Sequence, residues 1–212
     1  MSEPHPTLGS PAPGKLDIGP CFAAVGIPQG VIVDRASGEI AGAVWKGGKL
    51  VSLERLEYGL WTILLTPMTL NEATEAASSH SWGHLDQAIA RLGELDLLVT
   101  IEPGKVMDGA LARLRPLPLG LGLGNCTGDP TRFEIQNATL SLPSPVSLDT
   151  VGIMFWWEFD GTRSLREIAS RVAAQLPGLS IDRADTIITQ LAYGLMASRL
   201  LYLDCPVSRG SE

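Results

Sequence analysis

Two histidines and the serines beside them are the residues whose types and spacing could support catalysis or metal binding. His80 and His84 are four positions apart, as two zinc ligands on one helix face would be, but no glutamate follows His80 and no third ligand is evident. Ser79 and Ser81 flank His80 without an acidic partner or the strand-to-helix elbow of a nucleophilic serine. The sequence therefore predicts no catalytic site, no metal site and no cofactor, and it places both histidines in a solvated turn.

The composition predicts a globular protein and argues against two classes of partner. The chain has 212 residues, of which 45% are hydrophobic and 18% charged, enough for one large or two ordinary domains. Its net charge of −7 would repel nucleic acid and would not attract an anionic membrane. No run of about 18 apolar residues is present, so no membrane-spanning segment is expected.

Cysteine usage and the N-terminal segment favour a cytoplasmic location. Cys21, Cys126 and Cys205 are odd in number, far apart and without CxxC spacing. We therefore expect no disulfide framework, and a reducing compartment is the default. Residues 1–15 contain four prolines and neither a basic region nor a long apolar run, which does not fit a secretion signal.

The second half of the chain has the pattern of a β-hairpin followed by three helices and a strand. Asp149 is placed to cap a first helix, which Asp160 and Gly161 close. Ser164 and Glu167 have the spacing of a capping box at the start of a second helix. The remaining expected elements are hairpin strands at 131–136 and 139–142, a third helix at 182–199 and a strand at 200–203.

The first half shows the same order, which indicates an internal repeat. An offset of 95 residues pairs Trp61 with Trp156 and Thr69 with Ser164. The closing strands need an offset of 103, so the second copy has an insertion of 103 − 95 = 8 residues near 176–179. Trp156 is expected in the core because its position recurs. The expected elements are strands at 31–35, 40–46 and 49–51, a helix capped by Ser52, a helix beginning at Thr69, a third helix at 82–97 and a strand at 98–101.

The sequence therefore predicts an α+β protein with two tandem winged helix-turn-helix domains, each a small antiparallel sheet with three helices. The expected boundaries are a disordered Pro- and Gly-rich tail at 1–28, a first domain at 29–104, a second at 105–206 and a short tail at 207–212.

The second domain resembles the PqqD-like family, the winged-helix leader-peptide binding domains known as RiPP recognition elements. The most specific shared segment runs from Asp160 to Ile168, where the family has a helix end, a turn and a Leu-x-Glu-Ile helix start. The resemblance covers roughly residues 112–205, and it implies a first strand at 112–119 and a loop at 120–129. It implies that a leader peptide adds as an extra strand along the third strand of the sheet, over a groove walled by the third helix.

Strand addition has a simple physical basis: unpaired main-chain groups at a sheet edge provide affinity, and alternate side chains provide selectivity. Carried onto this chain, the resemblance implies a peptide edge formed by Thr139, Leu140, Ser141 and Leu142. It implies a groove wall formed by Asp185, Ile188, Thr189, Ala192 and Met196. The corresponding residues of the first half are those at 49–52, with Asp86, Ile89 and Gly93 on the helix. The competing interpretation is that Ile188, Ala192 and Met196 are core residues.

These patterns lead to three hypotheses about function. The first is a non-catalytic adaptor that presents a peptide or partner protein to a separate modifying enzyme. The second is a winged-helix transcriptional regulator, although neither third helix carries the Lys/Arg cluster that phosphate contacts require. The third is a structural or assembly protein that uses both repeats for protein contacts. An exposed edge strand is also compatible with a homodimer.

Overall fold

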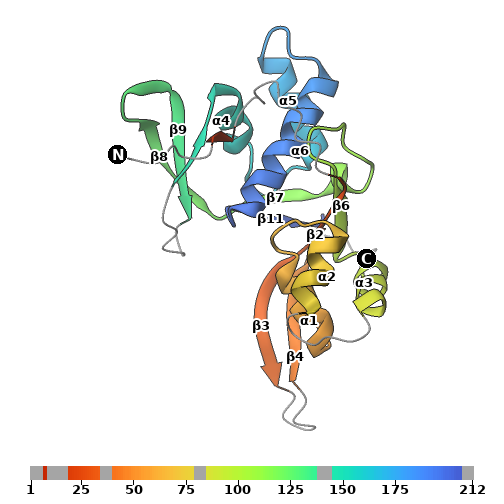
Figure 1. Cartoon of the computed structure of the whole chain (residues 1–212). Helices are drawn as coiled ribbons and strands as arrows, with labels where there is room; N and C mark the ends of the chain where they lie inside the picture. The colour runs from red at the N-terminus through yellow and green to blue at the C-terminus, as the bar shows by residue number, and fades with distance from the viewer. Residues whose placement is uncertain (1–6, 9–18, 34–39, 79–84, 138–144, 207–212) are drawn as a thin grey trace.

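The chain forms an α+β fold of small sheets and helices (Figure 1). The computed structural model describes residues 7–8, 19–33, 40–78, 85–137 and 145–206. Six α-helices lie within these ranges, and the sheets are antiparallel except where one short strand joins in parallel. No helix in the described ranges combines the length and apolar character needed to cross a membrane.

The first half begins and ends with strands that pair with each other. Its elements are β2 (Cys21–Ala24), β3 (Ile27–Val33), β4 (Ile40–Lys46), β5 (Lys49–Leu53), α1 (Arg55–Ile63), α2 (Leu70–Ser78), α3 (Leu85–Glu94) and β6 (Leu98–Ile101). The strands β3, β4 and β5 form an antiparallel sheet, and β2 pairs antiparallel with β6. Along the chain, the three helices therefore lie between β5, which ends the three-stranded sheet, and β6, which pairs with β2.

The second half repeats this order. Its elements are the 3₁₀ turn η1 (Leu111–Arg113), β7 (Arg115–Pro118), β8 (Gly120–Cys126), β9 (Asp129–Asn137), β10 (Val146–Leu148), α4 (Thr150–Trp157), α5 (Leu165–Gln175), α6 (Ile181–Ala197) and β11 (Leu201–Asp204). Here β7 pairs with β11, and β8, β9 and β10 form the larger sheet. One strand has no counterpart in the first half: β1 (Thr7–Leu8) pairs in parallel with β10.

The two halves follow the offsets expected from the sequence. The first helices begin 150 − 55 = 95 residues apart, and so do the second helices, 165 − 70 = 95. The closing strands begin 201 − 98 = 103 residues apart. Asp96 and Arg199, also 103 apart, both adopt positive φ after the third helix, at 48° and 53°. The same backbone course therefore occurs twice.

Local hydrogen bonds start the helices largely where the sequence places them. Asp149 accepts from the backbone nitrogen of Gly152 at 2.7 Å. Ser164 and Glu167 form the expected capping box, and the hydrogen bond from the Ser164 backbone lowers the pKa of Glu167. One start differs: α1 is capped by Glu54, not Ser52. The reason is that β5 continues to Leu53, so Ser52 still belongs to a strand.

Two stretches expected to lack regular structure are strands. The strands β1 and β2 and the start of β3 lie within 1–28, so the expectation of a disordered tail is wrong for these residues. The strand β8 occupies most of the expected loop at 120–129. Both depend on distant partners, β6 for β2 and the facing strand β9 for β8. The glycine-rich β8 keeps its pairing through register shifts beside Gly124, whose φ is +95°.

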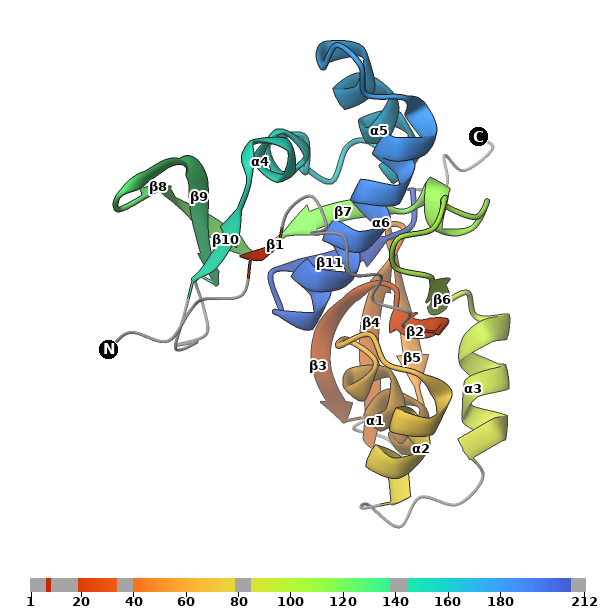
Figure 2. The same cartoon turned by 45° about the horizontal axis from the view of Figure 1, so that its top comes forward.

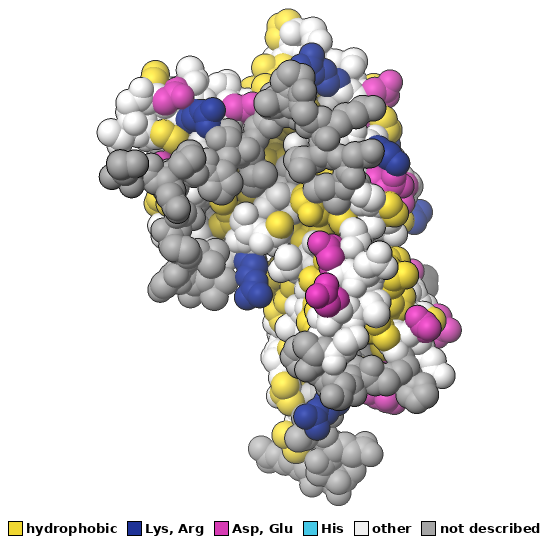
Figure 3. Space-filling model, in the orientation of Figure 1, with side chains coloured by type: hydrophobic (Ala, Val, Ile, Leu, Met, Phe, Trp, Pro, Cys, Tyr) yellow, Lys and Arg dark blue, Asp and Glu magenta, His cyan; other side chains and the backbone are white. Residues whose placement is uncertain are grey.

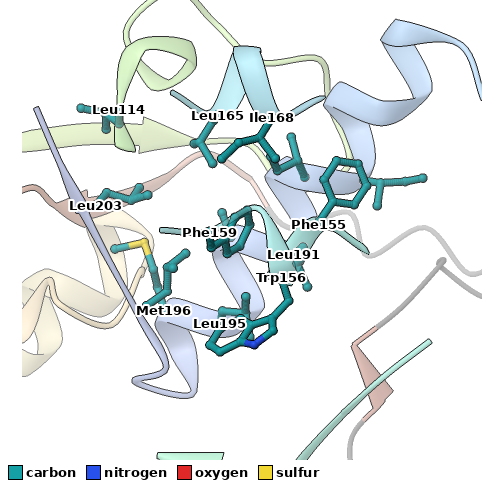
Figure 4. Packing of buried hydrophobic residues seen from close by; sticks show 14 of the residues in the cluster. Leu114, Phe155, Trp156, Phe159, Leu165, Ile168, Leu191, Leu195, Met196 and Leu203 are labelled. Carbon is teal, nitrogen blue, oxygen red and sulfur yellow. The ribbon is translucent and has the colours of Figure 1, made fainter. Parts of the chain in front are cut away.

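Each half has a buried cluster, and the second one spans both halves. The first cluster contains Trp61, whose indole nitrogen donates to the carbonyl oxygen of Val25 at 3.1 Å. In the second cluster, Trp156 and Phe159 lie against Leu191 of α6 (Figure 4). Both repeated tryptophans are thus core residues, with 0% and 8% of their surface exposed.

Backbone and side-chain hydrogen bonds join the halves where β11 passes the first sheet. The backbone nitrogen of Gly26 donates to the carbonyl oxygen of Leu203 at 2.7 Å. The nitrogen of Gly47, in the turn between β4 and β5, donates to Asp204 Oδ1 at 2.9 Å. Asp204 also accepts from the nitrogen of Cys205 at 2.8 Å. The turn of the first sheet is therefore held by the last strand of the second half.

We expect Asp204→Ala to lower the free energy of unfolding by about 1–3 kcal/mol, because it leaves the buried Gly47 N–H without an acceptor. Urea unfolding would measure the change. Asp204→Asn keeps an oxygen acceptor and serves as the matched control, with a smaller expected loss. Equal stability of Asp204→Ala and the unsubstituted chain would contradict this role for the contact.

Candidate functional site

The five helix residues expected to line a groove are buried. Asp185, Ile188, Thr189, Ala192 and Met196 share one side of α6, and none exposes more than 1% of its surface. Side chains without exposed surface cannot form the wall of an open groove. The expectation is therefore corrected: these residues belong to the interior, as the competing core interpretation held.

The segment between the halves and the closing strands of the first half cover this side of α6. Thr189 Oγ1 lies 2.8 Å from the carbonyl oxygen of Lys105, and Arg166 of α5 donates to the carbonyl oxygen of Met107 at 3.5 Å. Four first-half residues of β2, β6 and the turn after β2 join the same cluster: Ala23, Val25, Val99 and Ile101. A helix face that would be open in a single-domain protein is closed here by the other half.

Asp185 is a fully buried carboxylate at the start of α6. Its Oδ2 pairs with the guanidinium of Arg166, whereas Oδ1 has no hydrogen-bond partner among the described residues. Burial raises the pKa of Asp185, although the Arg166 guanidinium acts in the opposite direction. Because the carboxylate has no access to solvent, we interpret the pair as an anchor between α5 and α6 and not as a reactive group.

The third strand of the second-half sheet, β10, has a strand partner on each side. Thr139, Leu140, Ser141 and Leu142 lie outside the residues that the structure describes. The third-strand position is taken by β10, where Val146 pairs with Ile135 of β9. The opposite edge of β10 pairs with β1. A further strand could join at β10 only by displacing β1.

The equivalent strand of the first half has an unpaired edge. Among the described strands, β5 pairs only with β4. Lys46 and Lys49 face each other across the two-residue turn. By the alternation of an antiparallel ladder, Leu50 and Ser52 then direct their N–H and C=O groups away from β4. Both residues are exposed, and no described strand pairs with their outward main-chain groups.

The third helix of the first half also remains accessible. It lies on the side of the sheet away from β3 (Figures 1 and 2). Asp86 and Gly93 are exposed, and Ile89 is half-buried. Apart from its chain neighbours and the backbone of its own helix, nothing lies within 4 Å of the position that a Gly93 side chain would take. In contrast with α6, the residues named for this helix are therefore not covered by the other half.

An apolar strip crosses the first sheet and ends at the open edge. Gly42 lies against the ring of Tyr58 in α1. Because side chains alternate along a strand, the side chain of Trp45 is on the opposite face of the sheet, away from α1. On that opposite face Ile27 pairs with Trp45, and Trp45 pairs with Leu50. Trp45 is 40% exposed and Leu50 is 53% exposed. A strand added beside β5 would extend this strip.

Among the residues that the structure describes, basic side chains do not form a phosphate-binding group at this edge. Lys46 Nζ donates to the carbonyl oxygen of Leu95 at 2.6 Å and pairs with Asp96 at 3.3 Å. The adjoining Gly47 is buried, so this residue of the turn cannot enter a DNA groove. On the face shown in Figure 3, Lys and Arg side chains are scattered singly or in small groups.

Within the described ranges, no three His, Cys, Asp or Glu residues gather as a metal site would require. His80 and His84 lie outside those ranges.

Comparison with protein-family models, curated proteins and solved structures found no match for this chain.

We expect Asp185→Asn to change how stability depends on pH. Because the folded-state pKa is raised above the ordinary value of 3.8, the protonated carboxyl stabilises the fold fully below that value. This contribution is lost as the pH rises through the raised pKa. The stability of the unsubstituted chain relative to Asp185→Asn should therefore fall as the pH rises above 3.8, as urea unfolding across a pH series would show.

Asp182→Asn, in the exposed first turn of the same helix, is the matched control. It leaves Asp185 buried, which is the main cause of the raised pKa, so the downward trend should persist, although weakened because the charge of Asp182 also raises that pKa. A stability difference between Asp185→Asn and the unsubstituted chain that stayed constant with pH would contradict the raised pKa.

Proposed function

We propose that this protein is a non-catalytic adaptor that binds an extended polypeptide along β5 and presents it to a separate enzyme. The observation that carries the proposal is the unpaired edge of β5, beside which Leu50 and Ser52 are exposed. An added strand would pair with main-chain groups that have no partner among the described residues. The resemblance of the second half to leader-peptide binding domains supports the class of ligand, and the repeated order of elements supports moving the site to the first half.

The proposal includes a winged-helix fold for each half, with different roles for the two copies. Its support is the recurrence of a hairpin sheet, three helices and a closing strand at offsets of 95 and 103 residues. The second half would serve as the support, because α6 is buried against the first half. The first half would bind the guest, because its edge strand and third helix stay accessible.

The side chains around the edge indicate what the guest would present. A residue of the guest opposite Leu50 would lie at the end of the strip formed with Trp45, so an apolar or aromatic side chain is favoured there. The net charge of −7 disfavours a strongly acidic peptide. The proposed ligand is therefore a neutral or basic extended segment with an apolar anchor.

We expect Ser52→Pro to abolish strand addition, because proline removes the outward N–H at that position. The probe would be peptides selected from a random display library on the unsubstituted chain, with affinities then measured by titration calorimetry. Ser52→Ala retains the N–H and is the matched control, which should bind as tightly as the unsubstituted chain. Circular dichroism would establish that both variants are folded. Peptides that bind both variants equally, or a selection that enriches none, would contradict the proposal.

A transcriptional regulator remains the alternative, and duplex DNA provides the test. Because Lys46 is already paired and the chain carries a net charge of −7, we expect no binding to duplex DNA that strengthens as salt is lowered. Fluorescence anisotropy at two salt concentrations would measure it. A steep salt dependence would favour the regulator.

A further inference from the structure

The N-terminal strand β1 occupies the second-half position that is unpaired in the first half. It pairs in parallel with β10, Thr7 beside Ser147 and Leu8 beside Leu148. It also contacts α6, and Figure 2 shows it between β10 and that helix. The chain's own N-terminal segment thus lies along the outer edge of the third strand, next to the third helix.

The burial of the two third strands reflects this difference. Val146 and Ser147 of β10 are each 6% exposed and Leu148 is 0% exposed. In β5, by contrast, Leu50 is 53% exposed. An edge strand needs cover for its main-chain groups, or it pairs with another chain. At β10 the described cover along the outer edge is β1.

The described pairing of β1 with β10 is short. Prolines stand at positions 4, 6, 11 and 13, and a proline cannot donate to a strand ladder. Among the described residues, Thr7 and Leu8 pair with β10. The attachment is intramolecular, because residues 9–20 connect β1 to β2. A short connection gives an effective concentration on the order of millimolar, which keeps even a weak strand in place.

We propose that the outer edge of β10 is a second strand-addition site and that the N-terminal segment is its intramolecular occupant, displaceable by a polypeptide strand from another molecule. The segment would act as a tethered competitor: the apparent Kd for an outside strand equals the intrinsic Kd divided by the fraction of time that the edge is free. The same exchange between two copies would make each N-terminal segment a ligand for its partner. This inference concerns β10 and does not rest on a guest at β5.

The test uses the full chain and, as the probe, a fluorescent synthetic peptide of residues 1–18. The double variant Thr7→Pro/Leu8→Pro removes both N–H groups of the paired segment and frees β10. We expect it to bind the peptide about tenfold more tightly than the unsubstituted chain, as fluorescence anisotropy would show. Ser2→Pro/Glu3→Pro introduces the same number of prolines outside β1, and this matched control should bind as weakly as the unsubstituted chain.

Two further measurements separate pairing at β10 from other effects. A peptide that itself carries Thr7→Pro/Leu8→Pro should bind none of the chains. A chain lacking residues 1–18 should show the same gain as the double variant, so the result does not depend on one substitution. The inference is overturned if the double variant binds no more tightly than its control, or if the proline-containing peptide binds equally well. Ser52→Pro should leave this binding unchanged, because it alters only the edge of β5.

Discussion

The burial of ten of the seventeen residues of α6 is the constraint on which the rest of the structure depends. A helix inside one small domain normally keeps one face in solvent, but here the side that begins with Asp185 carries Ile188, Ala192 and Met196 and is closed. The cover comes from the first half and from the segment between the halves. Because this apolar surface is shared, the two halves cannot separate without exposing a core. The hydrogen bonds from Gly26 and Gly47 to the last strand follow from the same packing.

Duplication followed by such packing makes the two copies unequal. The copy that contributes the long third helix loses that helix as an accessible surface. The other copy, whose third helix is shorter, keeps an accessible helix and an unpaired strand edge. An unpaired edge strand is a liability for a protein because it can join other strands. Its retention at β5, while β10 is covered by β1, fits a division between a supporting copy and a binding copy.

The sequence predicted much of the fold, but it assigned a groove wall to residues of α6 that are buried. Helix starts at Asp149 and Ser164 are readable because the capping bonds span three residues. The repeat was readable because buried positions such as Trp61 and Trp156 recur with the caps at one offset. The groove assignment on α6 failed because one domain considered alone gives no sign of what the other domain covers. The apolar face of that helix was compatible both with a groove and with a core.

The sequence by itself determined the local features: the α+β class, the order of elements, the turn at Gly47 and Gly48, and the caps. Each of these depends on backbone preferences or on hydrogen bonds between residues a few positions apart. Tertiary structure alone decided that residues from Cys21 form a strand, that glycine-rich β8 pairs, and that β10 is covered while β5 is open. Those outcomes depend on partners far away in the chain. The residues of an edge strand do not show whether a distant segment will pair with it.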